Sequence, residues 1–286
     1  MNKNLFFTHP SFFNKAYRQT ALLLFTALFF SNMSNAAPES KLITYWNDHD
    51  AQSARIIDHS SWQTLLDQYL DSNHPSGINR VDYGELKKKG HPQLQSYLDQ
   101  LTAIDPRKLN RQEQMAYWIN LYNALTVDLI VRNYPTKSIR KVGEGFFSFG
   151  PWDDEITSIN GRSLTLNEIE HGILRPIFKD NRIHYAVNCA SLGCPNLAAQ
   201  AYTSNNTEKL LETSARDYIN HPRGVSLEDD HLVLSSIFDW YAVDFGNNEQ
   251  DLLKHLIKYA NKELAGKLDK FSGDIDYEYD WGLNRP

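Results

Sequence analysis

Apolar side chains recur at helical spacing over several stretches of the chain. Over residues 60–72 the apolar positions share one face of a helix. The longest pattern covers residues 110–135 and predicts a buried helix that ends at Pro135, because proline cannot continue a helix. Similar spacing predicts further helices at 91–104, 166–175, 210–222, 237–246 and 251–264.

Shorter runs rich in β-branched residues predict strands. Residues 154–166 are typical of a hairpin, because two such runs flank Asn160-Gly161, a strong turn signal. The other predicted strand segments are a hairpin at 225–235, a strand at 183–187 and a final strand at 275–284. Strands and helices do not alternate regularly, which favours an α+β fold with helices packed on a mainly antiparallel sheet.

The first 36 residues are typical of a secretory signal. Three basic residues and no acid precede a short apolar run, and Ser34 and Ala36 fit the small-residue positions of a signal peptidase site. The apolar run is short for a membrane-spanning helix. We therefore expect cleavage after Ala36, a single exported domain at 37–286, a periplasmic or secreted location and no membrane insertion after cleavage.

The charge of the expected mature chain narrows the range of partners. Removing the three basic residues of the signal from 29 leaves 26 Lys and Arg against 35 Asp and Glu, a net charge of −9. Nucleic-acid binding needs a basic surface, so we do not expect a nucleic acid as partner. We expect a peptide or small-molecule substrate of unknown identity.

Motifs for metals and cofactors are weak. Glu168 and His171 have the E-x-x-H spacing of di-iron sites, but such sites need a second pair, and the sequence contains no second copy. Residues 143–150 contain G-x-G without the helix context or the following Lys-Ser/Thr of a phosphate loop. We therefore expect no cofactor and no metal.

Five sequence blocks, in order, carry a family resemblance. They are YWINLYNALTVDLI (117–130), LTLNEIEHGILR (164–175), HYAVNCASLGCPNL (184–197), SSIFDWYAVDF (235–245) and YDWGLN (279–284). From about Gln112 to Asn284 the chain resembles the domain-of-unknown-function 547 family. The resemblance implies a domain of unassigned activity whose shape is similar to the papain and transglutaminase superfamily. The matching motif positions are Asn123, His171, His184, Cys189, Ser191 and Cys194.

Cys189 and Cys194 are the only cysteines, and they allow two interpretations. In an oxidising compartment they would form a local disulfide, because Gly193 and Pro195 predict the turn that this needs. Alternatively, Cys189 is a nucleophile between the strand at 183–187 and a helical turn. That turn would favour the thiolate and supply backbone N–H groups for an oxyanion. Cys194 would then protect or resolve Cys189 through a reversible disulfide.

A cysteine nucleophile commonly works with a histidine base and a residue that orients it. We expect His171 to be the base. On a strand, His184 would lie about 16 Å from Cys189 and point to the opposite face, so a structural role is favoured for it. Asp280 is the preferred orienting residue, and Asp244 and Asn123 are the alternatives.

Two classes of function follow from the sequence. The first is a cysteine-dependent hydrolase or acyltransferase acting on an amide or a thioester, with Cys189 as nucleophile. The second is a non-catalytic periplasmic binding module in which Cys189 and Cys194 form a disulfide. The oxidation state of the cysteine pair discriminates between them.

Overall fold

The computed structural model describes residues 38–143, 150–228, 231–246 and 248–286. The predicted signal sequence at 1–36 lies outside these ranges. The described helices are α1 (Ser60–Tyr69), α2 (Tyr83–Glu85), α3 (His91–Thr102), α4 (Arg111–Asn133), α5 (Arg175–Phe178), α6 (Thr207–Ile219), α7 (Ile237–Trp240), α8 (Glu249–Tyr259) and α9 (Lys262–Leu268). The strands are β1 (Leu70–Asp71), β2 (Arg80–Val81), β3 (Thr157–Ile159), β4 (Arg162–Leu164), β5 (Val225–Glu228), β6 (His231–Ser235) and β7 (Ile275–Glu278).

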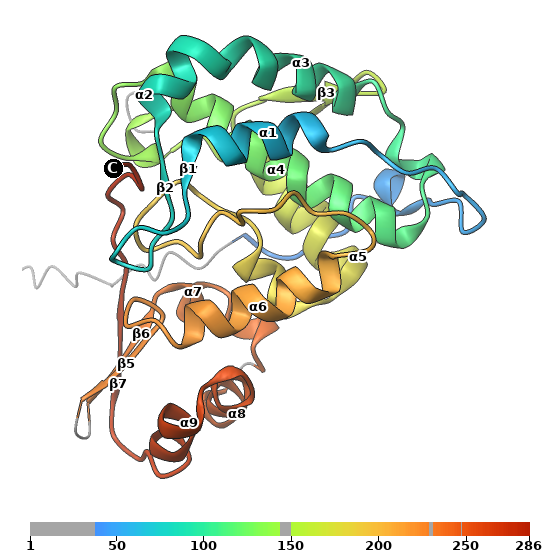
Figure 1. Cartoon of the computed structure of the whole chain (residues 1–286). Coiled ribbons are helices and arrows are strands. Elements are labelled where there is room, and N and C mark those ends of the chain that lie inside the picture. The colour runs from blue at the N-terminus through green and yellow to red at the C-terminus, as the bar shows by residue number, and fades with distance from the viewer. Residues whose placement is uncertain (1–37, 144–149, 229–230, 247) are drawn as a thin grey trace, which may run out of the picture. The chain divides into compact units, whose positions relative to one another are not determined.

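Helix α4 forms the centre of the larger hydrophobic core. Its N-terminus is capped by the Asn110 side chain, which accepts a hydrogen bond from the Glu113 N–H. Between residues 116 and 131 all its side chains are buried, as expected for a helix with apolar residues on every side. The helix ends at Asn133, just before Pro135, which confirms the predicted end. Helix α3 packs against α4, and α1 packs against α3 (Figure 1).

The predicted α+β class is confirmed, with strands in three small sheets. The pairs β1–β2, β3–β4 and β5–β6 are antiparallel, and β7 adds to β6 in parallel. The hairpin β3–β4 turns at Asn160 and Gly161, which both have positive φ, so this turn prediction is confirmed. Around the three-stranded sheet, α6, α7, α8 and α9 enclose a second, smaller core.

Several predicted ranges differ from the structure. Residues 183–187 were expected to be a strand, but Asn181–Tyr185 form a 3₁₀ helix, started by a hydrogen bond from the Arg182 N–H to the Asp180 side chain. Residues 251–264 form two helices because Asn261 caps a new one. The segment 166–175 forms a π-helical turn at Glu168–Leu174 and continues past Pro176 into α5, since proline is tolerated in a first helical turn.

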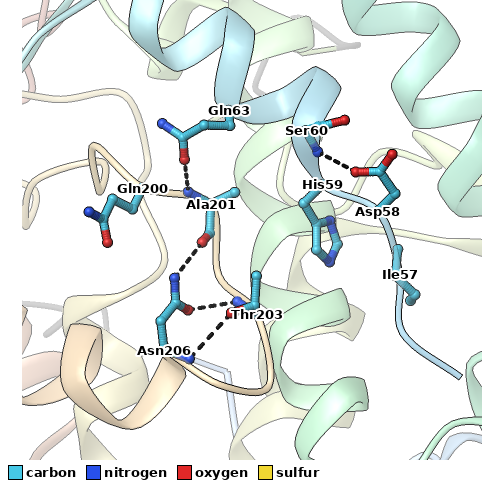
Figure 2. A pocket seen from close by; sticks show the side chains of 9 residues that line it. All are labelled: Ile57, Asp58, His59, Ser60, Gln63, Gln200, Ala201, Thr203 and Asn206. Atoms are coloured by element: carbon cyan, nitrogen blue, oxygen red, sulfur yellow. Dashed lines mark hydrogen bonds between the residues drawn. The ribbon is translucent and has the colours of Figure 1, made fainter. Parts of the chain in front are cut away.

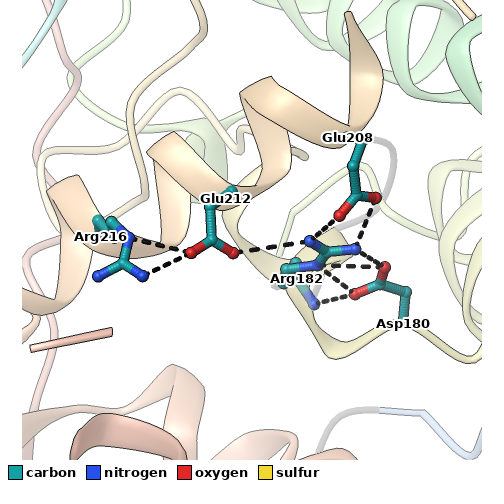
Figure 3. A network of polar contacts seen from close by, with 5 residues as sticks. All are labelled: Asp180, Arg182, Glu208, Glu212 and Arg216. Atoms are coloured by element: carbon teal, nitrogen blue, oxygen red, sulfur yellow. Dashed lines mark hydrogen bonds and ion pairs between the residues drawn. The ribbon is translucent and has the colours of Figure 1, made fainter. Parts of the chain in front are cut away.

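An ion-pair network fastens the 3₁₀ helix to α6. Figure 3 shows the Arg182 guanidinium between the carboxylates of Asp180 and Glu208, at 2.6 Å from each, with Glu212 at 3.7 Å. The Arg182 side chain is only 15 % exposed and Asp180 is 23 % exposed, so this pair is less screened by solvent than the pair with Glu208, which is 79 % exposed. The network holds residues 180–185, which precede Cys189 in the chain, against α6. Across the described part of the chain, no helix is both long and apolar enough to cross a membrane.

Candidate functional site

Cys189 and Cys194 lie at the two ends of a loop, residues 189–194 (the cysteine loop), which the C-terminal segment, residues 279–286, holds in place. The Leu192 N–H donates to the Gly282 carbonyl at 2.7 Å, and the Gly193 N–H donates to the Asp280 carbonyl at 2.8 Å. Figure 1 shows this last segment running from β7 towards α2 and β2. Residues 190–193 therefore form a bridge and a turn, and the predicted helical turn at this position was wrong.

The two sulfurs are in contact but not bonded. Both cysteines are free, and their Sγ atoms lie 3.0 Å apart. Cys189 is partly exposed, whereas Cys194 is 3 % exposed and its sulfur accepts a hydrogen bond from the Cys189 N–H at 2.9 Å. The expected disulfide is not formed in this structure, and the pair stands as two adjacent thiols.

Two hydroxyl groups complete the surroundings of the Cys189 sulfur. The Ser191 Oγ lies 3.1 Å from it and the Tyr279 hydroxyl lies 3.0 Å from it. Ser191 also donates to the Tyr279 oxygen at 3.0 Å, which leaves the Tyr279 proton free to point at the sulfur. An ionised Cys189 thus has hydrogen-bond donors on Tyr279 and Cys194, and on Ser191 when that hydroxyl rotates.

These contacts shift the pKa values of the two cysteines in opposite directions. Burial acts to raise the pKa of Cys189, but hydrogen bonds from Cys194, Ser191 and Tyr279 outweigh it and lower the pKa below 9.0. Burial and the neighbouring Cys189 raise the pKa of Cys194 well above 9.0. Cys189 is therefore the better thiolate, and Cys194 keeps its proton.

The predicted oxyanion site is not available at Cys189. The Cys189 N–H donates to Cys194, and the Ala190 N–H donates to the Asn188 side chain at 2.8 Å. Both backbone donors are thus already engaged. The donors that remain beside the sulfur are the hydroxyls of Ser191 and Tyr279.

Asn123 positions the cysteine segment from α4. Its Nδ2 donates to the Ala186 carbonyl at 2.9 Å, and its Oδ1 accepts from the Asn188 N–H at 2.8 Å. All three residues of these two hydrogen bonds are buried, so Asn123 anchors the backbone just before Cys189. Asp280 lies on the C-terminal segment that pairs with this loop, and its carboxylate accepts a hydrogen bond from the Gly282 N–H at 2.7 Å. Neither side chain orients a histidine through a hydrogen bond that the structure describes.

The two candidate histidines belong to a separate buried cluster of charges. The His184 Nε2 lies 2.7 Å from Asp244 Oδ2, and this oxygen also accepts from Arg175 Nε at 2.6 Å. The His171 Nδ1 accepts from Arg175 Nη1 at 3.1 Å. Among the described hydrogen bonds of the Cys189 sulfur, none comes from a histidine. The arrangement pairs His184 with Asp244, whereas the predicted pairing of His171 with Cys189 is not formed.

Glu170 adds a buried carboxylate to this cluster. Burial acts to raise its pKa, but the charges of His171 and of His184, whose Nδ1 lies 3.7 Å from Glu170 Oε1, lower the pKa to about 2. Its Oε2 accepts from the Tyr122 hydroxyl at 3.1 Å. The Glu170 charge raises the pKa of Cys189, and the hydrogen bonds of the sulfur with Ser191 and Tyr279 lower it again.

Aromatic side chains flank the cysteine site. The Tyr279 ring lies 4.8 Å from the Trp240 ring and 4.6 Å from the Trp281 ring, and all three side chains are partly exposed. Arg140 lies over Trp281 at 5.3 Å. The two tryptophan rings are tilted by 52° and 53° to the Tyr279 ring, so the three form an aromatic cluster around the tyrosine that contacts the sulfur. The sequence did not indicate this contact, because Tyr279 lies 90 residues from Cys189 along the chain.

A polar pocket lies elsewhere, between the start of α1 and the loop before α6 (Figure 2). Its volume is about 390 Å³. Gln63 accepts from the Ala201 N–H at 2.8 Å and so fixes one wall. His59 is 4 % exposed and lines the pocket; its Nδ1 contacts the Tyr97 hydroxyl at 2.7 Å. Neither cysteine lines this pocket.

A second pocket of about 360 Å³ has aromatic and acidic walls and lies beside α7 and α8. In the described ranges, no group of three or more His, Cys, Asp or Glu side chains is arranged to hold a metal ion.

One comparison with known proteins gives a match. Residues 106–219 match the family model described as "Protein of unknown function, DUF547". No curated protein and no solved structure matches the chain. The expected similarity to papain and transglutaminase therefore stays a prediction. The matched segment includes α4, both cysteines and, from the charge cluster, Glu170, His171, Arg175 and His184, but not Asp244.

Proposed function

The chain belongs to the DUF547 family, and we propose that its cysteine loop is the active site of an exported cysteine-dependent hydrolase or acyltransferase with Cys189 as nucleophile. The observation that supports this most is the surroundings of the Cys189 sulfur. A partly exposed thiol there has hydrogen-bonding partners on Cys194, Ser191 and Tyr279, within 3.1 Å. Such contacts favour the thiolate, which is the form that attacks.

The geometry favours a thioester over an amide as substrate. An amine leaves an acyl centre only when it takes up a proton, so amide cleavage commonly needs a histidine acid beside the nucleophile. The described contacts of the Cys189 sulfur include no histidine. A thiol leaving group has a pKa of about 8.5 and leaves as its thiolate, so it needs no such acid.

The proposed reaction has two steps. The Cys189 thiolate attacks the carbonyl carbon, a carbon–sulfur bond forms, and the substrate's thiolate leaves. Water or an acceptor then attacks the acyl carbon, its proton passes to the released substrate thiolate, the carbon–sulfur bond to Cys189 breaks, and Cys189 leaves as a thiolate. The hydroxyls of Ser191 and Tyr279 lie next to the sulfur and are the donors for the developing oxyanion.

The test uses a small acetyl thioester and the protein reduced with a phosphine. We expect acetylation of Cys189, detected by mass spectrometry of the peptides, followed by turnover of the thioester. Cys189→Ala should abolish both, and Cys194→Ala is the matched control that keeps the nucleophile. A folded, reduced protein that releases no thiol and gains no acetyl group on Cys189 refutes the proposal.

A second candidate function is a binding module stapled by a Cys189–Cys194 disulfide. The 3.0 Å contact between the two sulfurs favours it, because bond formation needs an approach of only about 1 Å. In that case the protein purified without reductant carries no free thiol, and the bond resists mild reductants.

A further inference from the structure

The cysteine loop contains one outer and one inner thiol in direct contact. Cys189 is partly exposed, and Cys194, at 3 % exposed, lies behind it with its Sγ 3.0 Å away. Two thiols so placed can act in sequence on one external disulfide: the outer sulfur attacks, and the inner sulfur resolves the mixed disulfide. Acyl transfer uses Cys189 alone and gives no role to Cys194 as a nucleophile.

We propose that the Cys189–Cys194 pair carries a second activity, thiol–disulfide exchange with an external uncharged disulfide. In the first step the Cys189 thiolate attacks one sulfur of the substrate, a mixed disulfide forms, and one substrate thiolate leaves. In the second step the Cys194 sulfur attacks the Cys189 sulfur, and the second substrate thiolate leaves. The two protein thiols are oxidised to one disulfide, and the substrate disulfide is reduced to two thiols.

The hydrogen bonds around the pair fit both steps. Cys194 is a hydrogen-bonding partner of Cys189 and stabilises its thiolate before the first attack. The Cys189 N–H donates to the Cys194 sulfur at 2.9 Å, so this donor remains when Cys194 has to ionise. The proton of Cys194 passes to the first substrate thiolate, so no further acid or base is needed.

The loop backbone is already shaped to bring the sulfurs together. Ala190 has a left-handed φ of 59°, which turns the chain sharply after Cys189. Gly193 lies so close to the C-terminal segment that an added Cβ would be 2.8 Å from the Asp280 nitrogen. The loop is thus held in the contact geometry, and closure of the disulfide moves the sulfurs by about 1 Å from their separation of 3.0 Å.

The surroundings indicate the kind of disulfide that fits. Tyr279, Trp240 and Trp281 present partly exposed rings next to Cys189, and Glu170 is a nearby buried anion. The apolar rings and the Glu170 charge favour an uncharged disulfide over an anionic one, against the opposing charge of Arg140 over Trp281. We therefore choose bis(2-hydroxyethyl) disulfide as the neutral probe and an anionic aromatic disulfide, 5,5′-dithiobis(2-nitrobenzoate), as its comparison.

The experiment follows the masses of the fully reduced protein after addition of the neutral probe. For the wild type we expect loss of two hydrogens, release of two probe thiols per protein and no accumulated adduct. Cys194→Ser should stop at a mixed disulfide on Cys189. Cys189→Ser should react at least tenfold more slowly, because the remaining thiol is buried. The anionic probe should react more slowly than the neutral one with the wild type.

Three results overturn this proposal. They are a stable wild-type mixed disulfide, equal reactivity of Cys189→Ser and wild type, and a folded wild type that does not react while the protein in guanidinium does. The wild-type results decide the question even if a variant fails to fold. The acyl-transfer proposal is tested separately, by acetylation of Cys189 in the reduced wild type with the thioester. Acetylation without disulfide exchange refutes only the exchange, and exchange without acetylation refutes only acyl transfer.

Discussion

Replacing Tyr279 by Phe tests whether the hydroxyl contacts make Cys189 reactive. The change removes the hydroxyl that lies 3.0 Å from the Cys189 sulfur but keeps the ring that packs against Trp240 and Trp281. A hydrogen bond to a charged group contributes about 1.5–3 kcal/mol. Since one pKa unit corresponds to about 1.4 kcal/mol, the loss alone would raise the thiol pKa by about 1–2 units.

Ser191 reduces this effect. In the wild type its single proton is shared between the Tyr279 oxygen and the Cys189 sulfur. Without the Tyr279 oxygen, that proton turns fully to the sulfur and replaces part of the lost stabilisation. We therefore expect a rise of about one unit for Tyr279→Phe, and a larger rise when Ser191→Ala is added.

The assay is the pH dependence of alkylation of Cys189 in the reduced protein, measured on the isolated peptide by mass spectrometry. The Ser191→Ala single variant is the matched control, and its shift should be smaller than that of the double variant. An unchanged or lowered pKa in Tyr279→Phe, with the protein still folded, would show that these hydroxyls do not set the reactivity of Cys189.

Three further changes test the support of the site and the pH response of the fold. Asn123→Ala leaves two buried backbone groups unpaired and should cost about 2–4 kcal/mol in urea unfolding; a loss below about 1 kcal/mol would contradict its anchoring role. Gly193→Ala should cost about 1–3 kcal/mol and slow the alkylation of Cys189, because the new Cβ meets the Asp280 backbone. Its control is Gly266→Ala, which has open space around it in a helix and should be neutral or stabilising. Burial lowers the pKa of His59 from 6.5 to about 4. Neutral His59 therefore stabilises the fold fully above pH 6.5, and about 3 kcal/mol of the free energy of unfolding is lost as the pH falls to 4. His59→Gln should reduce this loss, and a variant with the same pH profile of unfolding as the wild type would refute it.

The longer helices were predictable because their apolar spacing extends over several turns. The pattern at 110–135 gave α4 with its end near Pro135, and Asn160-Gly161 gave the turn of the β3–β4 hairpin. The segment 183–187 was not predictable, because five apolar or aromatic residues have no period that separates a strand from a short buried helix.

The chemistry of the site was only partly visible in the sequence. Cys189 and Cys194 stood out because there are no other cysteines, and their contact follows from a short loop. Tyr279 was missed because it reaches Cys189 through pairing of the C-terminal segment with the cysteine loop, which no local pattern encodes. His171 was expected to be the base for Cys189, whereas its Nδ1 accepts a hydrogen bond from Arg175, four residues along the chain.

The pH dependence of alkylation of the two thiols in the reduced wild-type protein tests the central claim most directly. Peptide mass spectrometry separates the two sites, and the protein in guanidinium supplies the reference for an ordinary thiol pKa of about 8.5. We predict that Cys189 reacts with an apparent pKa below that reference and that Cys194 stays unlabelled while the protein is folded. Equal labelling of both thiols, or a Cys189 pKa at or above the reference, would contradict a nucleophilic role for Cys189.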